Sequence, residues 1–243
     1  MLKRNLTFVY GFLTFNLLWF LAAMVVDSPM LVNPIDVYLS IGDHPDIGTH
    51  IGASLLRIAK GLAISLLIGM PVGLTMAYFP RMNKICSPLL YFTYPIPKLA
   101  LLPVVMLLLG IGESAKIVMI VLILVFQIII STRDAALHIP ASDFHVLLSL
   151  GANKWQLLRW VTFPAILPEV LTSLRIAIGT ALSVLFFTET YGTDRGMGFY
   201  IVDAWMRLSY TSMYVGILAL SLIGFLLFVL TDSLEEYLCK WKK

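Results

Sequence analysis

Residues 6–26 contain no charged side chain, and this uninterrupted apolar run restricts what the chain can fold into. A helical membrane crossing takes about 20 apolar residues, so the segment is long enough to span a bilayer. Hydrophobic residues make up 59% of the chain and charged residues 13%, a balance that excludes an ordinary soluble domain. We therefore expect an all-α polytopic membrane protein, a single domain over residues 1–243 with six transmembrane helices. The predicted spans are 6–26, 62–79, 85–109, 117–132, 171–188 and 208–231.

Basic residues gather in particular connections between these spans. They are Lys3, Arg4, Arg81, Lys84, Arg133, Lys154, Arg159, Lys240, Lys242 and Lys243. Residues 27–50 instead hold four aspartates and neither lysine nor arginine. Because basic connections stay on the cytoplasmic side of a membrane, we expect both termini and the loop 133–169 in the cytoplasm. Residues 27–50 are expected outside.

The loop between the fourth and fifth predicted spans has the pattern of two short helices joined by a tight turn. Residues 144–150 are expected to form the first helix, and Gly151 stands where a helix end favours positive φ. Asn153 can cap a second helix over residues 154–161, which Pro164 is expected to stop.

This helix pair has two interpretations. Trp155 and Arg159 lie four positions apart, on neighbouring faces of the second helix, where a soluble protein could bind them. Alternatively, Trp155 and Trp160 lie at the depth of the lipid headgroups and only anchor the bundle.

Glu189 is an ionisable residue at the end of a predicted span. It follows Arg175 by 14 positions, so the two share a helix face roughly 21 Å apart, with Glu189 at the outer end. Ionisable groups at membrane depth usually face the protein interior or a cavity. Glu189 is therefore a candidate gate or cavity-lining residue. The alternative is an interfacial carboxylate that neighbouring backbone or Arg195 satisfies.

Prolines interrupt the third predicted span. Pro95, Pro97 and Pro103 break helical hydrogen bonding, and irregular backbone at membrane depth requires a cavity or protein cover. Lys98 lies beside them and could attract an anionic solute or extend to an interface. These residues are candidates for a translocation path. The spacing Gly69-x3-Gly73 indicates close helix packing.

Several motifs in register carry a family resemblance over residues 30–231. Gly151 is followed after nine residues by Val-Thr-Phe-Pro, although His145-Val-Leu stands where the family motif begins with Glu-Ala-Ala. The other motifs are Ser54-Leu-x-Arg57, Gly69-x-Pro71-x-Gly73, Pro95-x-Pro97-Lys98, Leu150-Gly151-Ala152, Phe163-Pro164-x3-Pro168 and Glu189 with Gly196-Met-Gly198. Together they resemble permease subunits of ATP-binding-cassette importers, in the nitrate, sulfonate and taurine branch.

The resemblance implies a fold, partners and a mechanism. The fold would be the MetI-like bundle of type I importers, in a bacterial inner membrane. Two cytoplasmic ATPases, which bind ATP and Mg²⁺, would grip the loop 133–169 of this chain and of a second permease copy. An extracytoplasmic binding protein would deliver a small anion, or else a vitamin precursor. The residues implied in ATPase docking are His145, Leu150, Gly151, Ala152, Asn153, Trp155, Arg159 and Pro164.

Other functions find little support in the residues. The sequence has no Gly-x4-Gly-Lys-Ser/Thr phosphate loop, so we expect no ATP hydrolysis, no cofactor and no catalytic residue in this chain. The histidines lack metal-ligand spacing, so we expect no metal site, and the apolar composition points to lipid rather than nucleic acid. An autonomous secondary carrier commonly has repeated halves, which this sequence lacks. An intramembrane hydrolase needs a nucleophile paired with a base inside the membrane, and no such pair is evident.

Overall fold

The computed structural model describes residues 2–242, and the side chains of residues 10–241. The side chains of Lys3, Arg4, Lys242 and Lys243, which entered the orientation argument, lie outside the described part. The described chain is helical and contains no strand. Its α-helices are α1 (Leu2–Val26), α2 (Pro34–Ser40), α3 (Ile47–Tyr78), α4 (Pro80–Thr93), α5 (Leu102–Leu109), α6 (Glu113–Leu137), α7 (Ala141–Ser149), α8 (Lys154–Leu157), α9 (Phe163–Glu189), α10 (Met197–Met206) and α11 (Tyr210–Leu238).

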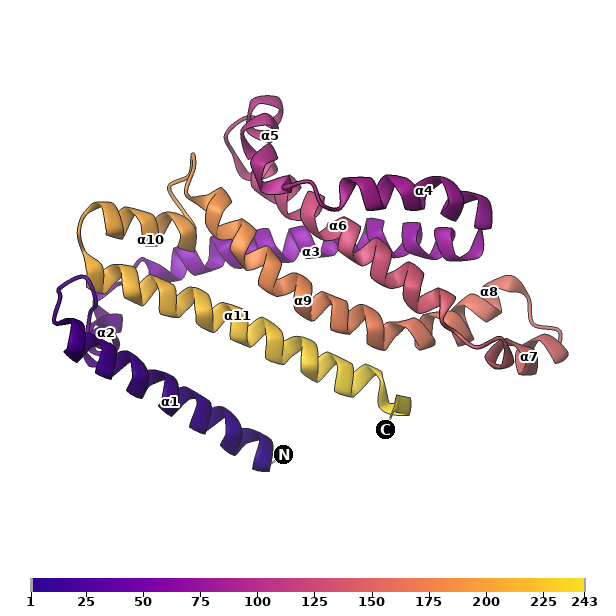
Figure 1. The fold of residues 1–243 in the computed structure, drawn as a ribbon, viewed down its shortest axis with the longest axis horizontal. Coiled ribbons are helices and arrows are strands. Elements are labelled where there is room, and N and C mark those ends of the chain that lie inside the picture. Colours follow the sequence, from indigo (N-terminus) through magenta and orange to yellow (C-terminus); the bar gives the residue numbers. More distant parts are fainter. Residues whose placement is uncertain (1, 243) are drawn as a thin grey trace.

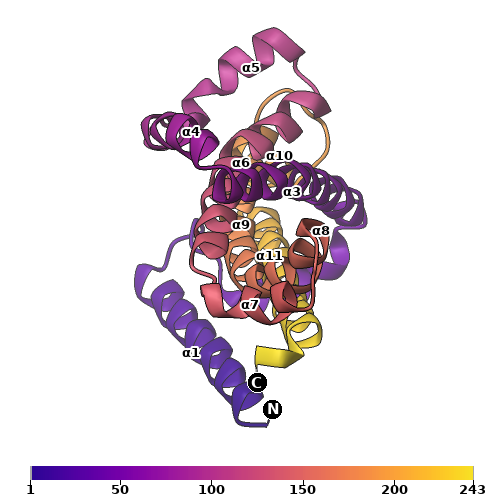
Figure 2. The ribbon, with the colours of Figure 1, turned by 90° about the vertical axis from the view of Figure 1, so that its right-hand side faces the viewer.

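Four long helices run side by side and form the body of the bundle. They are α3, α6, α9 and α11 (Figures 1 and 2). α4 folds back beside α3, and α5 projects away from the bundle. α7 and α8 lie at one end, and α10 lies at the other end together with α2 (Figure 1).

Each predicted span overlaps a long helix except 85–109, which covers parts of α4 and α5 and the break between them, and the count of six is only partly confirmed. Among the described residues, α3, α6, α11 and the helix Lys154–Glu189 are long and apolar enough to cross a membrane. A fifth crossing results if α4 and the segment Lys98–Leu109, bent by 83°, count as one span. The predicted span 6–26 lies in α1, of which only Tyr10–Val26 can be assessed, as a shorter apolar helix.

The long helices extend beyond the predicted spans because charged residues inside them find partners. Hydropathy ends a span at a charge, whereas a charged group that is paired within protein can stay in a helix. Arg133 illustrates the correction. We expected it in a loop, yet it lies in α6, 5% exposed. It donates to Asp134 Oδ1 at 2.8 Å, to Ser87 Oγ at 3.0 Å and to Tyr91 Oη at 3.2 Å.

The core lies where α6 packs between α3 and α9. Its fully buried members include Ile58, Met119, Ile120, Leu124, Ile128, Ala177, Ala181 and Leu185. Gly69 and Gly73 lie on α3 against α6, as the Gly-x3-Gly spacing predicts. A Cβ built on Gly69 lies 2.7 Å from Ile128 Cγ2, and one built on Gly73 lies 2.7 Å from the Ile129 carbonyl oxygen. Glycine therefore lets the two helices approach closely.

Replacing Gly73 with alanine is expected to destabilise the fold. The added methyl group would meet the Ile129 backbone, which cannot move without moving α6, and overpacking of this kind costs about 1–3 kcal/mol. Thermal unfolding of the detergent-purified protein measures the loss. Gly179→Ala is the matched control, because a Cβ at Gly179 on α9 meets nothing within 4 Å. Equal unfolding temperatures for the two variants would contradict the expectation.

Candidate functional site

The α7–α8 segment, residues 141–162, projects beyond the ends of α6 and α9 (Figure 1). Gly151 joins its two helices with φ of 77°, and a Cβ at this position would meet nothing within 4 Å. The Gly151 N–H donates to the Leu148 carbonyl at 3.0 Å, and the Ala152 N–H donates to the Leu147 carbonyl at 3.0 Å. The predicted left-handed turn is confirmed, and its demand for glycine is conformational rather than steric.

Asn153 caps α8, as predicted. Its Oδ1 accepts from the Gln156 N–H at 2.9 Å, and Gln156 Oε1 accepts from the Asn153 N–H at 2.7 Å. This reciprocal capping box fixes the start of α8 and satisfies two backbone donors. The Asn-x-x-Gln spacing was visible in the sequence, but our interpretation used only Asn153.

The prediction that Pro164 stops the second helix is wrong. α8 continues through a π-helical turn, η3 (Leu158–Thr162), into α9. Pro164 comes just after the π-helical turn, and Pro168 lies inside α9, so neither proline ends the helix. The helix therefore runs for 36 residues from Lys154 to Glu189. The observed connection between the two long helices is shorter than the predicted loop 133–169. It begins after Leu137, where α6 ends, and reaches only to Lys154.

Most of the residues predicted for docking face outwards. Leu150 is 77% exposed and Trp155 66% exposed, and the Arg159 guanidinium lies 5.5 Å from the centre of the Trp160 ring. His145, Asn153 and Arg159 are also exposed, whereas Ala152 and Pro164 are half-buried. The segment thus presents an exposed surface that combines apolar and basic side chains.

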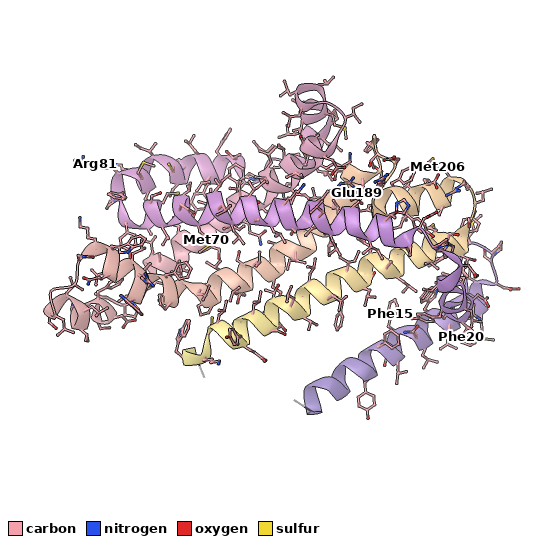
Figure 3. The ribbon with its side chains drawn as sticks, turned by 180° about the vertical axis from the view of Figure 1, so that it is seen from behind. Phe15, Phe20, Met70, Arg81, Glu189 and Met206 are labelled. Carbon is pink, nitrogen blue, oxygen red and sulfur yellow. The ribbon has the colours of Figure 1, made fainter. Side chains whose placement is uncertain are left out.

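Glu189 lies towards the end of the bundle that carries α10 and Met206 (Figure 3). It was a candidate gate or cavity-lining residue, with a carboxylate satisfied by its neighbours as the alternative, and its side chain is 0% exposed. Arg57 Nη1 donates to Glu189 Oε1 at 2.6 Å, and Ser54 Oγ donates at 2.8 Å to the same oxygen. The Gly198 N–H donates to Oε2 at 2.9 Å. Arg195 contributes a backbone carbonyl to Arg57, at 2.8 Å, and not its guanidinium to Glu189.

Arg57 on α3 joins Glu189 to a second carboxylate, Glu113, at the start of α6. Arg57 Nε donates to Glu113 Oε2 at 2.7 Å, and Nη2 donates to Glu113 Oε1. Nη2 also contacts Thr193 Oγ1 at 3.4 Å. All five guanidinium donors of Arg57, which is 3% exposed, thereby have an acceptor. In the sequence Arg57 appeared only as part of a motif, which did not predict that it joins the two carboxylates.

Lys116 completes what we call the Arg57 cluster: Ser54, Arg57, Glu113, Lys116 and Glu189. Lys116 is fully buried and donates to the Gly112 carbonyl at 3.3 Å and to the Gly192 carbonyl at 3.4 Å. The cluster links α3, α6 and α9 to the connection between α9 and α10. Four charged groups are thus gathered near one end of an otherwise apolar bundle.

The Gly196-Met-Gly198 motif has a steric reason to contain glycine. Gly196 has φ of 124°, and a Cβ there would lie 2.4 Å from Glu189 Cδ. A Cβ at Gly198 would lie 2.4 Å from the Phe186 carbonyl oxygen. Both glycines let the chain pass directly over the Glu189 carboxylate.

The proline-rich break has its own set of contacts, which include none of the Arg57 cluster's hydrogen bonds. α4 ends at Thr93, a 3₁₀ turn η2 (Lys98–Leu101) follows, and α5 begins at Leu102. Lys98 Nζ donates to the Tyr94 carbonyl at 3.1 Å and lies 4.9 Å from the centre of the Phe126 ring. Pro95 and Pro97 lie in the break, and Pro103 lies in the first turn of α5. Lys98 and Glu189, which we grouped as path candidates, therefore have different partners.

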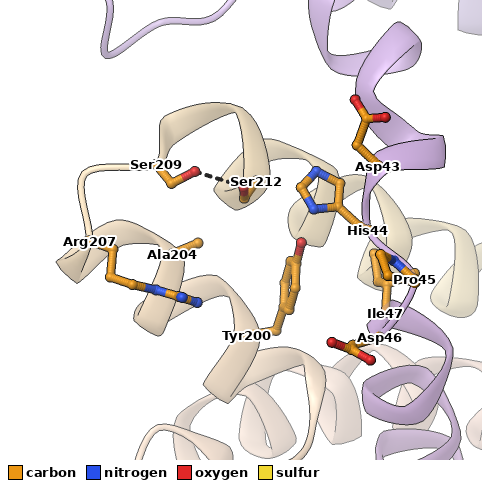
Figure 4. A pocket seen from close by; sticks show the side chains of 10 residues that line it. All are labelled: Asp43, His44, Pro45, Asp46, Ile47, Tyr200, Ala204, Arg207, Ser209 and Ser212. Atoms are coloured by element: carbon orange, nitrogen blue, oxygen red, sulfur yellow. Dashed lines mark hydrogen bonds between the residues drawn. The ribbon is translucent and has the colours of Figure 1, made fainter.

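A cavity of about 290 Å³ opens at the end opposite the α7–α8 segment (Figure 4). It is lined by residues 43–47 and by Tyr200, Ala204, Arg207, Ser209 and Ser212. Tyr200 Oη and His44 Nε2 are buried and have no hydrogen-bond partner among the described residues. No pattern along the chain predicts this cavity, because its two walls are more than a hundred residues apart.

Comparison with known proteins decides the family. The profile described as "Binding-protein-dependent transport system inner membrane component" matches residues 65–241. The chain belongs to this family. It is 32% identical to the taurine transport system permease protein TauC of Escherichia coli, over 99% of this chain and 91% of TauC. It is 30% identical to the formylaminopyrimidine transport permease protein ThiX of Halalkalibacterium halodurans, over 96% of this chain and 94% of ThiX.

Further similarities agree with this membership. The bicarbonate transport system permease protein CmpB of Synechococcus elongatus is 30% identical, over 78% of this chain and 67% of CmpB. Among solved structures, an inward-facing MetNI methionine ABC transporter chain superposes with a TM-score of 0.68 at 21% identity, covering 79% of this chain and 95% of that one. A chain of a bacterial ABC importer of alginate gives a TM-score of 0.62 at 18% identity, covering 97% and 96%.

The protein is therefore a multi-pass membrane permease of an ABC importer, with a MetI-like fold. As such it is a transport subunit, of a kind that in general has ATPase and binding-protein partners. The family profile includes the α7–α8 segment and Glu189, whereas Ser54 and Arg57 precede its first matched residue. The alignment with TauC covers the whole Arg57 cluster.

Proposed function

We propose that the permease imports a small solute with an anionic group, driven by two cytoplasmic ATPases that bind ATP and Mg²⁺ and grip the α7–α8 segment. The observation that carries the docking part is the continuous helix Lys154–Glu189, which connects the exposed segment rigidly to the Arg57 cluster. Movement of α8 would therefore be transmitted to the far end of α9. Such a lever suits a transporter that alternates between two rigid arrangements.

The distribution of charge supports a cytoplasmic position for the α7–α8 segment. The segment itself contains Lys154 and Arg159, and Arg81 lies at the same end of the bundle (Figure 3). The aspartates of residues 36–46 lie at the other end, with α2. Basic residues favour the cytoplasmic side. The N-terminal end of α1 and the C-terminal end of α11 would therefore face the cytoplasm.

A second permease copy is proposed as the partner of α4 and α5. Phe92 on α4 is 79% exposed, and Leu107 and Leu108 on the projecting helix α5 are 86% and 77% exposed. In a dimer the path would run between the copies, beside the break that contains Pro95 and Pro97. Two copies would also supply one docking segment to each of two ATPases.

The substrate class rests on the relatives. TauC is named for taurine, which carries a sulfonate, and CmpB for bicarbonate. ThiX is named for formylaminopyrimidine, a vitamin precursor, and is similar at 30% identity, so a neutral heterocycle is the second candidate. The binding protein would present the solute at the end that carries the cavity beside Tyr200.

Uptake into proteoliposomes tests the substrate. We expect the permease, reconstituted with its ATPase and binding protein, to take up ethanesulfonate or bicarbonate only when ATP is inside the vesicles with Mg²⁺. Native mass of the purified complex should correspond to two permeases and two ATPases. Uptake of formylaminopyrimidine alone would overturn the anion assignment, and uptake without the ATPase would indicate a secondary carrier.

Replacing Trp155 with alanine is expected to weaken ATPase docking, with at least about a tenfold loss of affinity if this exposed aromatic ring is an anchor of the interface. Co-purification of the ATPase with tagged permease measures the effect. Trp205→Ala is the matched control, because Trp205 is similarly exposed, at 58%, on α10 at the other end. Equal ATPase recovery with both variants would contradict docking through Trp155.

A further inference from the structure

The two sides of the Arg57 guanidinium are held in very different ways. Nη1 is fixed by the Glu189 carboxylate at 2.6 Å and the Arg195 carbonyl at 2.8 Å, and Glu189 is 0% exposed. Nε and Nη2 are held by Glu113, whose side chain is 62% exposed, and by a long contact with Thr193. Arg57 thus has one buried, permanent partner and one partner at the protein surface.

The Glu113 carboxylate can leave Arg57 at low cost to itself. An exposed carboxylate returns to water when its ion pair opens, whereas a buried one would lose its only solvation. When Glu113 leaves, the Nε and Nη2 donors lose its carboxylate as their acceptor and are open on the side from which it approached.

Without Glu113 the buried part of the cluster has a positive charge. Arg57 and Lys116 carry two positive charges and Glu189 one negative charge, which leaves one charge uncompensated. The hydrogen-bond partners of Lys116 supply no negative counter-charge, because both are backbone carbonyls. The charges of Lys60, Asp194 and Arg195 nearby are exposed to solvent, which screens them, so the balance of the buried groups does not include them. A single negative charge therefore restores neutrality.

We propose that Glu113 occupies an anion-binding position and that the anionic group of the transported solute displaces it from Arg57 during import. This inference rests on the proposed import of an anion and adds the residues that would select it. The two parallel N–H donors of Arg57 match a pair of oxygens on a carboxylate, sulfonate, nitrate or bicarbonate. A monoanion would be preferred, because a second negative charge finds no further buried cation.

Binding of ethanesulfonate to the purified permease–ATPase complex tests the proposal. In the wild type Glu113 competes with the anion, whereas Glu113→Gln removes the competing charge. We expect the dissociation constant for ethanesulfonate to be about tenfold lower in Glu113→Gln, measured by calorimetry or by the rise in unfolding temperature. Glu169→Gln, an exposed glutamate on α9, is the control and should behave as the wild type. Chloride at the same ionic strength controls for screening.

A second substitution separates an anion site from a structural ion pair. Arg57→Lys keeps the charge but loses the two parallel donors, so combined with Glu113→Gln it should abolish the gain in affinity. If the wild type, Glu113→Gln and Glu169→Gln bind ethanesulfonate equally, or none binds it, the proposal is overturned. Should Glu113→Gln fail to fold, Glu113→Asp, which keeps the competing charge but holds it farther from Arg57 on a shorter side chain, is expected to show a smaller gain in the same direction. If wild-type vesicles import only formylaminopyrimidine, the proposed function fails, and a gain of affinity in Glu113→Gln is still measurable.

Discussion

Replacing Glu189 with glutamine is expected to cost about 3–5 kcal/mol of stability, because it leaves the buried Arg57 guanidinium with only one, exposed, carboxylate. Glu189 also accepts from Ser54 and from the Gly198 N–H, and glutamine keeps only one acceptor oxygen, so the connection to α10 would be held less firmly. The unfolding temperature in detergent and the yield of folded permease measure the effect. Glu169→Gln on the same helix is the matched control, since Glu169 is exposed.

This experiment also tests the gate role of Glu189, which stays a prediction. A loss of folded protein together with ATPase assembly would mean that Glu189 is a structural anchor and not a gate. A variant that folds and assembles normally but transports poorly would support the gate. Uptake, assembly and unfolding temperature should therefore be measured on the same preparations.

Replacing Gly151 with valine is expected to abolish ATPase-coupled uptake or the assembly of the complex. The residue has φ of 77°, a conformation that is costly for a β-branched side chain, so α7 and α8 would change their relative orientation. No steric clash contributes, because a Cβ at Gly151 meets nothing within 4 Å. Uptake and ATPase co-purification measure the outcome.

Two further variants make the Gly151 result specific. Gly151→Asn should retain more activity than Gly151→Val, because asparagine tolerates positive φ. Gly48→Val adds the same side chain at another open position, in the first turn of α3 with negative φ, and is expected to assemble and transport normally. Wild-type uptake by Gly151→Val would show that the turn is not needed for docking.

The parts of the candidate site that the sequence predicted are those that neighbouring residues decide. The turn at Gly151 and the cap at Asn153 depend on backbone groups within a few positions, so their residue types are informative by themselves. Pro164 marks the limit of such local rules. A proline can end one helix or begin the next, and the same residue type fits both, so only the packed chain shows that α8 continues into α9.

By itself the sequence determined that this protein is a helical membrane protein, because its apolar runs are long enough to span a bilayer and no soluble core could use them. It also determined the family, through motifs in register. Only the tertiary structure decided what the charged residues do. Arg57 is 132 positions from Glu189 and 56 from Glu113, and no pattern along the chain pairs such residues. They meet because α3, α6 and α9 pack together, and because ionised groups buried in an apolar bundle need charged or hydrogen-bonding partners.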